Sequence, residues 1–356
     1  MTELLPAFLD ELLGDAELAR LIGTTADCAA MLRFELALAQ AEADHDLIPQ
    51  ISASEISAAA ATFQPDLAML RQATLKDGVV VPEFVRQLRQ HVGEPAGRHV
   101  HFGATSQDVI DTALALKLKP VFDLFETRLE AVIARLEALI RTFGNNPMMG
   151  RTRMQAAIPI TAGDRLAVWC GLIERAKGQI GEVRRQNLIL SLAGPAGTAE
   201  KFGGKISGVR RDLALALELS VPDYVPHAAR DRIAGLGNWL SQVTGALGKI
   251  GQDIALMAQN EIAEVAIDGA GGSSAMAHKH NPVLAEVLVT LARFNAVQLS
   301  GLHQALVHEQ ERSGAAWTDG PVAAGDEQAA DRGDRGPGRG RRHGARALVR
   351  CQGDGA

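Results

Sequence analysis

Residues 118–139 carry an apolar side chain alternately every four and every three positions. This 3.5-residue period, kept over three heptads, is typical of the seam of a coiled-coil-like helical bundle. It predicts one long helix over residues 106–143, which Pro120 is expected to bend near its start. The repeating positions are Leu118, Phe122, Phe125, Leu129, Val132, Leu136 and Leu139.

The rest of the chain favours helices as well. Aromatic residues make up only 4% of it, while alanine and leucine, both strong helix formers, are abundant. Further long helices are predicted over 161–190, 227–260 and 282–311, and a helix of about 30 residues is about 45 Å long. Shorter helices are expected over 28–45, 52–61, 83–92 and 207–219, with a short extended piece at 79–82. The predicted fold class is all-α, an elongated central bundle of long helices with a smaller N-terminal helical domain. Such rods usually pack against partner chains, so we expect an oligomer.

Composition divides the chain into three parts. We predict an N-terminal helical domain over 1–104, the long-helix bundle over 105–318 and a segment of different character over 319–356. The last part holds nine glycines, seven arginines and six acidic residues, with no lysine and no aromatic residue. Such a segment buries too little apolar surface to offset the entropy of ordering. We therefore expect it to be disordered, or to come from a shifted reading frame, and to have no role in function.

Charge and cysteine content exclude several classes of protein. The net charge of −6 argues against a nucleic-acid partner, which would need a basic face. Cys28, Cys170 and Cys351 are far apart and form no CxxC pair, so neither a disulfide framework nor a thiolate zinc site is expected. A reducing, cytoplasmic location follows. The chain shows no basic and apolar leader and no run of 18 uncharged apolar residues, so we expect no signal peptide and no membrane span.

A glycine- and serine-rich loop with a lysine, residues 269–282, is the first stretch that suggests chemistry. Asn281 is a good helix N-cap and Pro282 suits the first helical position, so Lys279 is expected beside the positive end of a helix dipole. A carboxylate or an enolate-like dianion could bind there. The loop is not a phosphate-binding P-loop, because the GxxxxGK[ST] pattern is absent.

Two further stretches offer anion-binding groups. Thr105 and Ser106 place hydroxyls at the start of the long helix, where Ser106 could cap it and free N–H groups could hold an anion. Arg151, Arg153 and Gln155 alternate with apolar residues, and two arginines on one edge suggest carboxylate recognition. Plain alternatives remain for both stretches, a simple helix cap for the first and a solvated edge for the second.

The histidines of the chain do not indicate a metal site. His278 and His280 flank the loop lysine, but two ligands without a carboxylate are a weak metal site, so we expect no metal and no cofactor. His101 could either orient a substrate or pack against the neighbouring Phe102.

Together these stretches resemble the fumarase/aspartase superfamily, a group of cofactor-free lyases and cycloisomerases. GSSAMAHKHNP at 272–282 is similar to its signature loop GSSxMPxKxNP, GATSQDVIDTA at 103–113 to its first conserved stretch, and GRTRMQAAIPIT at 150–161 to its second. The resemblance covers roughly residues 1–317 and implies an all-α homotetramer whose active sites combine the three stretches from different subunits.

The resemblance also implies residue roles. Ser273 would be the general acid/base, with loop N–H groups and Lys279 stabilising its alkoxide. Lys279 and Asn281 would bind the substrate carboxylate that becomes an aci-form dianion. In a small polycarboxylate substrate, Thr105 and Ser106 would bind a second carboxylate with help from Gln155. The charge of Arg153 suggests that it meets the third, and His101 is the remaining candidate for orienting the substrate.

Two features favour the cycloisomerase branch of this superfamily. Arg153 stands where the fumarate-forming lyases often carry a histidine, and the segment 308–317 is similar to the cycloisomerase ending EHERGAGAW. The expected reaction converts 3-carboxy-cis,cis-muconate to 4-carboxymuconolactone in aromatic degradation. The alternatives are an adenylosuccinate- or argininosuccinate-lyase-like β-elimination and a non-catalytic scaffold. After Thr318 the similarity stops, so the small C-terminal helical domain of the superfamily is expected to be missing.

Overall fold

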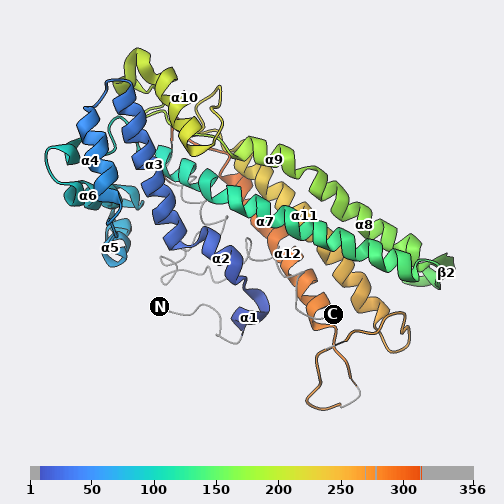
Figure 1. The fold of residues 1–356 in the computed structure, drawn as a ribbon. Coiled ribbons are helices and arrows are strands. Elements are labelled where there is room, and N and C mark those ends of the chain that lie inside the picture. The colour runs from blue at the N-terminus through green and yellow to red at the C-terminus, as the bar shows by residue number, and fades with distance from the viewer. Residues whose placement is uncertain (1–8, 269, 277–278, 313, 315–356) are drawn as a thin grey trace.

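The computed structural model describes residues 9–268, 270–276, 279–312 and 314, and this part of the chain is a long bundle of helices with a cluster of shorter helices at one end (Figure 1). The predicted all-α fold is confirmed. The helices are α1 (Asp10–Leu13), α2 (Ala16–Ile22), α3 (Thr24–Asp44), α4 (Gln50–Ala60), α5 (Leu67–Asp77), α6 (Val81–Val92), α7 (Ser106–Phe143), α8 (Ala162–Gly178), α9 (Ile180–Asn187), α10 (Ile206–Leu217), α11 (Asp231–Met257) and α12 (Val283–Gln304). The strands are β1 (Pro147–Thr152) and β2 (Gln155–Thr161), and two short 3₁₀ helices cover Ala96–His99 and Glu200–Lys205.

Helix α7 is the spine of the bundle and has the bounds that the heptad pattern predicts. Most of the repeating side chains are buried, and they pack with α8, α9 and α11 into one apolar core. Pro120 lies inside the helix, which continues through it. The central side chains of this core are Phe122, Phe125, Ile173, Trp239 and Val243.

A second apolar core joins the helices at the other end. It is built by α3, α4, α6 and α10 around the first turns of α7, with Phe34, Phe84 and Phe202 fully or almost fully buried. The division of the chain at residue 104 stays a prediction, and the segment 319–356 lies outside the described residues.

Helices α11 and α12 run side by side and approach closely through small residues. A side chain added at Gly251 would lie 2.5 Å from the Ala285 carbonyl oxygen, and one at Gly248 would lie 2.5 Å from Ala292 Cβ. Elsewhere α12 exposes apolar side chains, since Leu284 is 64% and Val297 70% exposed.

By length and composition alone α12 could cross a membrane, whereas the sequence predicts no membrane span; one such helix is weak evidence for a span. It carries Glu286 and Arg293, however, and an arginine near a bilayer centre costs about 2.5–3.5 kcal/mol.

Three sequence predictions need correction. Val81 and Pro82 begin α6 instead of forming an extended piece, because proline is well suited to the first turn of a helix. The helix predicted over 161–190 breaks at Gln179 into α8 and α9. The strands β1 and β2, which form an antiparallel hairpin, were not predicted at all.

Candidate functional site

The signature loop lies between α11 and α12, and it surrounds Ser273 with backbone donors. The backbone N–H groups of Ala275 and Met276 donate to Ser273 Oγ over 3.3 and 3.2 Å. Lys279 is exposed in the same loop. Negative charge on Ser273 Oγ would therefore meet two N–H donors already aimed at it.

The base of this loop is closed by Asn281. Gly271 and Asn281 exchange backbone hydrogen bonds of 2.9 and 2.7 Å, and Asn281 Nδ2 donates to the Gly272 carbonyl oxygen over 2.9 Å. Helix α12 begins only at Val283, with Pro282 in the N-cap position. The prediction that Asn281 caps this helix is therefore wrong, because its side chain ties the loop together instead.

The second predicted stretch forms the N-terminus of α7. Thr105 is the N-cap and exchanges capping-box hydrogen bonds with Asp108, whereas Ser106 is the first helical residue. The predicted cap at Ser106 is thus corrected by one position. Both hydroxyl residues are partly exposed at a helix N-terminus, where free N–H groups and the helix dipole favour an anion.

Asp108 ties this helix start to two other segments. Its fully buried carboxylate accepts from the backbone N–H groups of Ala193 and Gly194 over 2.8 and 3.0 Å, and it lies 2.7 Å from His227 Nε2. The loop that carries Thr105 is therefore fixed from behind by a dense set of hydrogen bonds.

Asp111 binds the segment before α11 in the same way. It lies 2.7 Å from Arg230 and 3.5 Å from Arg232. Burial raises the pKa of Asp111, but the two guanidinium groups outweigh it and hold that pKa below its usual value. His227 and both arginines were not predicted as site residues, although a histidine followed by Arg-Asp-Arg at the start of a long helix is a signal for them.

His101 precedes this helix in a left-handed conformation, with φ of 62°. Its Nδ1 lies 2.7 Å from Oε1 of Glu35 on α3. The ring is thus held by a carboxylate and not only packed in the core, and its side chain remains 14% exposed.

The third stretch is the β1–β2 hairpin, which turns through Arg153 and Met154. Both residues have positive φ, 49° and 65°, as a two-residue hairpin turn requires. Arg153 and Gln155 are exposed at the tip. Arg151 instead forms an ion pair with Glu264, which ties the hairpin to the connection between α11 and α12.

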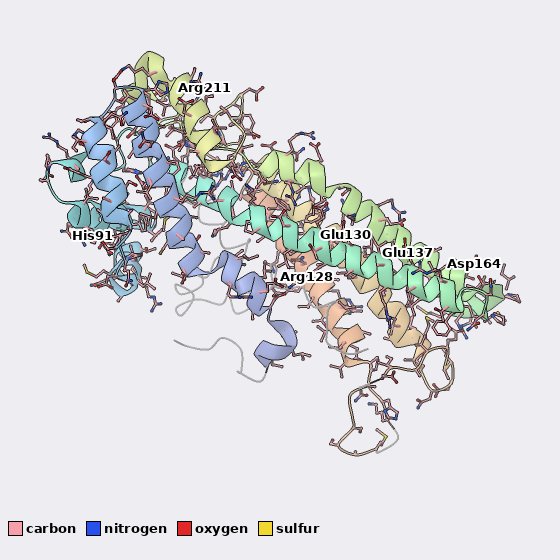
Figure 2. All side chains as sticks on the ribbon, in the orientation of Figure 1. His91, Arg128, Glu130, Glu137, Asp164 and Arg211 are labelled. Atoms are coloured by element: carbon pink, nitrogen blue, oxygen red, sulfur yellow. The ribbon has the colours of Figure 1, made fainter. Side chains whose placement is uncertain are left out.

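Within one chain, Thr105 at the start of α7 lies far from the other two stretches. Helix α7 spans 38 residues, or about 57 Å, and separates Thr105 from the hairpin that follows its other end. Helix α11 spans 27 residues, or about 40 Å, between the segment at Asp111 and the signature loop. Figure 2 shows how far apart the two ends of the bundle are. Arg211 of α10 lies at one end, and Asp164, in the first turn of α8 just after the hairpin in the sequence, lies at the other.

Within the described residues, no group of three or more histidine, cysteine or acidic side chains is arranged to hold a metal ion. His280 is exposed in the signature loop, and His278 lies outside the described residues.

Comparison with known proteins gives a consistent set of relatives. A family model described as lyase matches residues 16–297. The chain is 38% identical over 295 residues to a 3-carboxy-cis,cis-muconate cycloisomerase from Bradyrhizobium diazoefficiens, covering 81% of this chain. It spans 65% of that relative's length, just under two thirds.

One solved structure and one further relative are also similar to this chain. The structure of the 3-carboxy-cis,cis-muconate lactonizing enzyme from Pseudomonas putida aligns with a TM-score of 0.83 and 32% identity, covering 97% of this chain and 76% of that one. An N-acetyl-S-(2-succino)cysteine lyase from Enterococcus italicus is 31% identical over 313 residues, which is 86% of this chain and 68% of the relative.

Proposed function

The chain belongs to the lyase family, and we propose that within it the protein is a cycloisomerase that closes 3-carboxy-cis,cis-muconate to 4-carboxymuconolactone. The observation that carries the proposal is the signature loop, in which two backbone N–H groups already point at Ser273 Oγ. The cycloisomerase from Bradyrhizobium diazoefficiens, at 38% identity, supports the choice of substrate. This reaction belongs to the bacterial degradation of aromatic compounds.

The proposed reaction is an isomerisation of the acid; because the attacking carboxyl group has already lost its proton, the ionised substrate takes up one proton from solvent. An oxygen of one substrate carboxylate attacks a carbon of the conjugated diene and forms the lactone C–O bond. The electron pair of the broken π bond moves toward the carbon beside another carboxylate, which becomes an aci-form dianion. Ser273 gives its proton to that carbon, and its alkoxide is reprotonated from solvent at the end of the cycle.

This reaction path needs groups that stabilise the developing negative charge and one correctly positioned proton donor. Lys279 supplies a positive charge in the same loop as Ser273, and the dianion develops beside it. Asn281 holds the loop base closed, as its bond to Gly272 indicates. Thr105 and Ser106 at the start of α7 bind a second carboxylate, and Arg153 with Gln155 at the hairpin tip binds a third.

This assignment needs several copies of the chain. Rigid helices of about 40 and 57 Å keep the start of α7 apart from the signature loop and from the hairpin in one protomer. The exposed apolar face of α12 offers a surface on which protomers can associate. We therefore propose a homotetramer whose active sites combine stretches from different subunits.

The test is an ultraviolet assay on the purified protein, which follows loss of the conjugated diene of 3-carboxy-cis,cis-muconate. Ser273→Ala should abolish the reaction, whereas Ser274→Ala, a change of the adjacent exposed serine, should retain it. Adenylosuccinate and an S-succinylated cysteine are followed in parallel for fumarate release, the reaction class that the Enterococcus relative's name suggests. Fumarate release without diene loss would replace the cycloisomerase by a β-elimination lyase, and silence with every substrate would refute both.

A further inference from the structure

Two buried glutamates on α3 differ in whether their carboxyl group has a hydrogen-bond partner. The side chains of Glu35 and Glu42 are both buried, at 2% and 0% exposure. Oε1 of Glu35 lies 2.7 Å from His101 Nδ1, while its Oε2 has no hydrogen-bond partner among the described residues. Neither oxygen of Glu42 has such a partner. An imidazole is therefore available to one carboxyl group and not to the other.

This difference decides where the protons lie. A buried carboxylate without a partner costs several kcal/mol, so such a group normally takes up a proton. Glu42 follows this rule, because burial and the nearby Glu35 raise its pKa to about 10. Glu35 differs because His101 Nδ1 lies 2.7 Å from its Oε1. A positive charge on the imidazole would compensate a carboxylate at Glu35 through a charge-assisted hydrogen bond.

The charged groups around His101 favour the protonated form of its imidazole. Burial lowers the pKa of His101, but Glu35 of α3 and Asp108 of α7 outweigh burial and raise that pKa above its usual value. Arg89 of α6 acts in the opposite direction and donates its own hydrogen bonds to the Val100 carbonyl oxygen. Nδ1 of His101 is engaged by Glu35, and no described residue bonds to its Nε2.

We propose that Glu35 is a positioning residue that keeps His101 as an imidazolium, whose Nε2–H binds a substrate carboxylate together with Thr105 and Ser106. The inference rests on the proposed function, since it requires a polycarboxylate substrate. Glu35 acts from behind the ring and never touches the substrate. The left-handed backbone of His101, four residues before Thr105, places the imidazole on the same loop as the anion-binding hydroxyls.

The test measures binding without turnover. Tricarballylate, an unreactive tricarboxylate, is titrated into the full-length protein by calorimetry at several values between pH 6 and 8.5. The affinity of the wild-type protein for tricarballylate should change little over the lower part of this pH range. Glu35→Gln should lower the pKa of His101, because an adjacent opposite charge is lost. Its affinity should fall roughly 10- to 100-fold at pH 7.5, the loss typical of a charge-assisted hydrogen bond, and recover toward pH 6.

Matched variants separate positioning from damage to the fold. Glu42→Gln changes a buried glutamate on the same helix that is already neutral, so it should bind like wild type at every pH. His101→Gln should bind weakly at all pH values, and adding Glu35→Gln to it should cause no further loss. A Glu35→Gln variant with unchanged affinity, or with a loss that does not recover at pH 6, would overturn the inference.

The proposed reaction is judged separately on the same preparation. Wild type that binds tricarballylate in this way but does not consume the muconate diene would remove the proposed reaction and leave the role of Glu35 standing. Diene consumption by wild type, together with a Glu35→Gln variant that keeps the wild-type pH profile of tricarballylate binding, would support the proposed reaction and overturn the role of Glu35.

Discussion

Replacing Glu42 with glutamine should stabilise the protein by an amount that grows with pH. The side chain of Glu42 is fully buried in the core around α3, and neither carboxyl oxygen has a hydrogen-bond partner among the described residues. Burial raises its pKa from 4.5 to about 10, so the folded protein holds a proton there that the unfolded chain releases near pH 4.5. Between these two values the unfolded state binds fewer protons, and the free energy of unfolding falls as pH rises.

The magnitude follows from the unfolded state alone, provided that the folded pKa lies above the working pH. At pH 7 the unfolded chain gains about 3.4 kcal/mol by ionising a group with a pKa of 4.5, at 1.36 kcal/mol for each pH unit. Glutamine has nearly the same shape and does not ionise. The free energy of unfolding of Glu42→Gln relative to wild type should therefore rise by about 2.7 kcal/mol between pH 6 and pH 8.

Urea unfolding followed by circular dichroism at pH 6, 7 and 8 measures this slope. The protomer concentration must stay fixed, because association contributes to the apparent stability. Glu55→Gln on α4 is the control, since its exposed side chain should give a difference that does not change with pH. Parallel profiles for Glu42→Gln and wild type would show that this carboxyl group is not held neutral in the fold.

Two further predictions concern the α11–α12 pair. Gly251→Ala should lower the free energy of unfolding by about 1–3 kcal/mol, because its Cβ would lie 2.5 Å from the Ala285 carbonyl oxygen. Gly245→Ala, in the same helix with nothing within 4 Å, should raise it by roughly 0.5–1 kcal/mol in the same unfolding assay. Val297→Glu, on the exposed face of α12, should shift the protein toward smaller species in sedimentation, whereas Leu75→Glu on α5 should not; equal behaviour of these two variants would contradict an interface at α12.

The sequence was most informative where one strong period acted without competition. The heptad pattern predicted the body of α7, because its buried side chains repeat with the geometry of the bundle, although the N-cap is Thr105 and not Ser106. Pro120 did not end that helix, since packing on α8 and α11 outweighs one lost hydrogen bond. Helix α5 was missed because it buries little beyond Leu70 and so lacks an apolar stripe.

The candidate site was predicted as a set of residues but not as a geometry. The hairpin strands escaped prediction because β2 is exposed on both faces and shows no alternation of apolar and polar side chains. Glu35 and His227 are each far in the sequence from the groups that they hold, His101 and Asp108, and such long-range pairs leave no local pattern. The roles proposed for Ser273 and the other site residues stay predictions that the assays above address.

Separation of the catalytic stretches by rigid helices makes one prediction that no single-chain site would share. A variant with Thr105→Val and Ser106→Ala lacks one part of the site, and Ser273→Ala lacks another, so each should be inactive alone. If each site takes these parts from different protomers, random reassembly of equal amounts unites two intact parts in about one quarter of sites. Mixing the two variants under conditions that exchange subunits should therefore restore up to about a quarter of wild-type activity. Because no single chain in that mixture carries both intact parts, a mixture that stays inactive although subunit exchange is demonstrated would contradict a site shared between protomers.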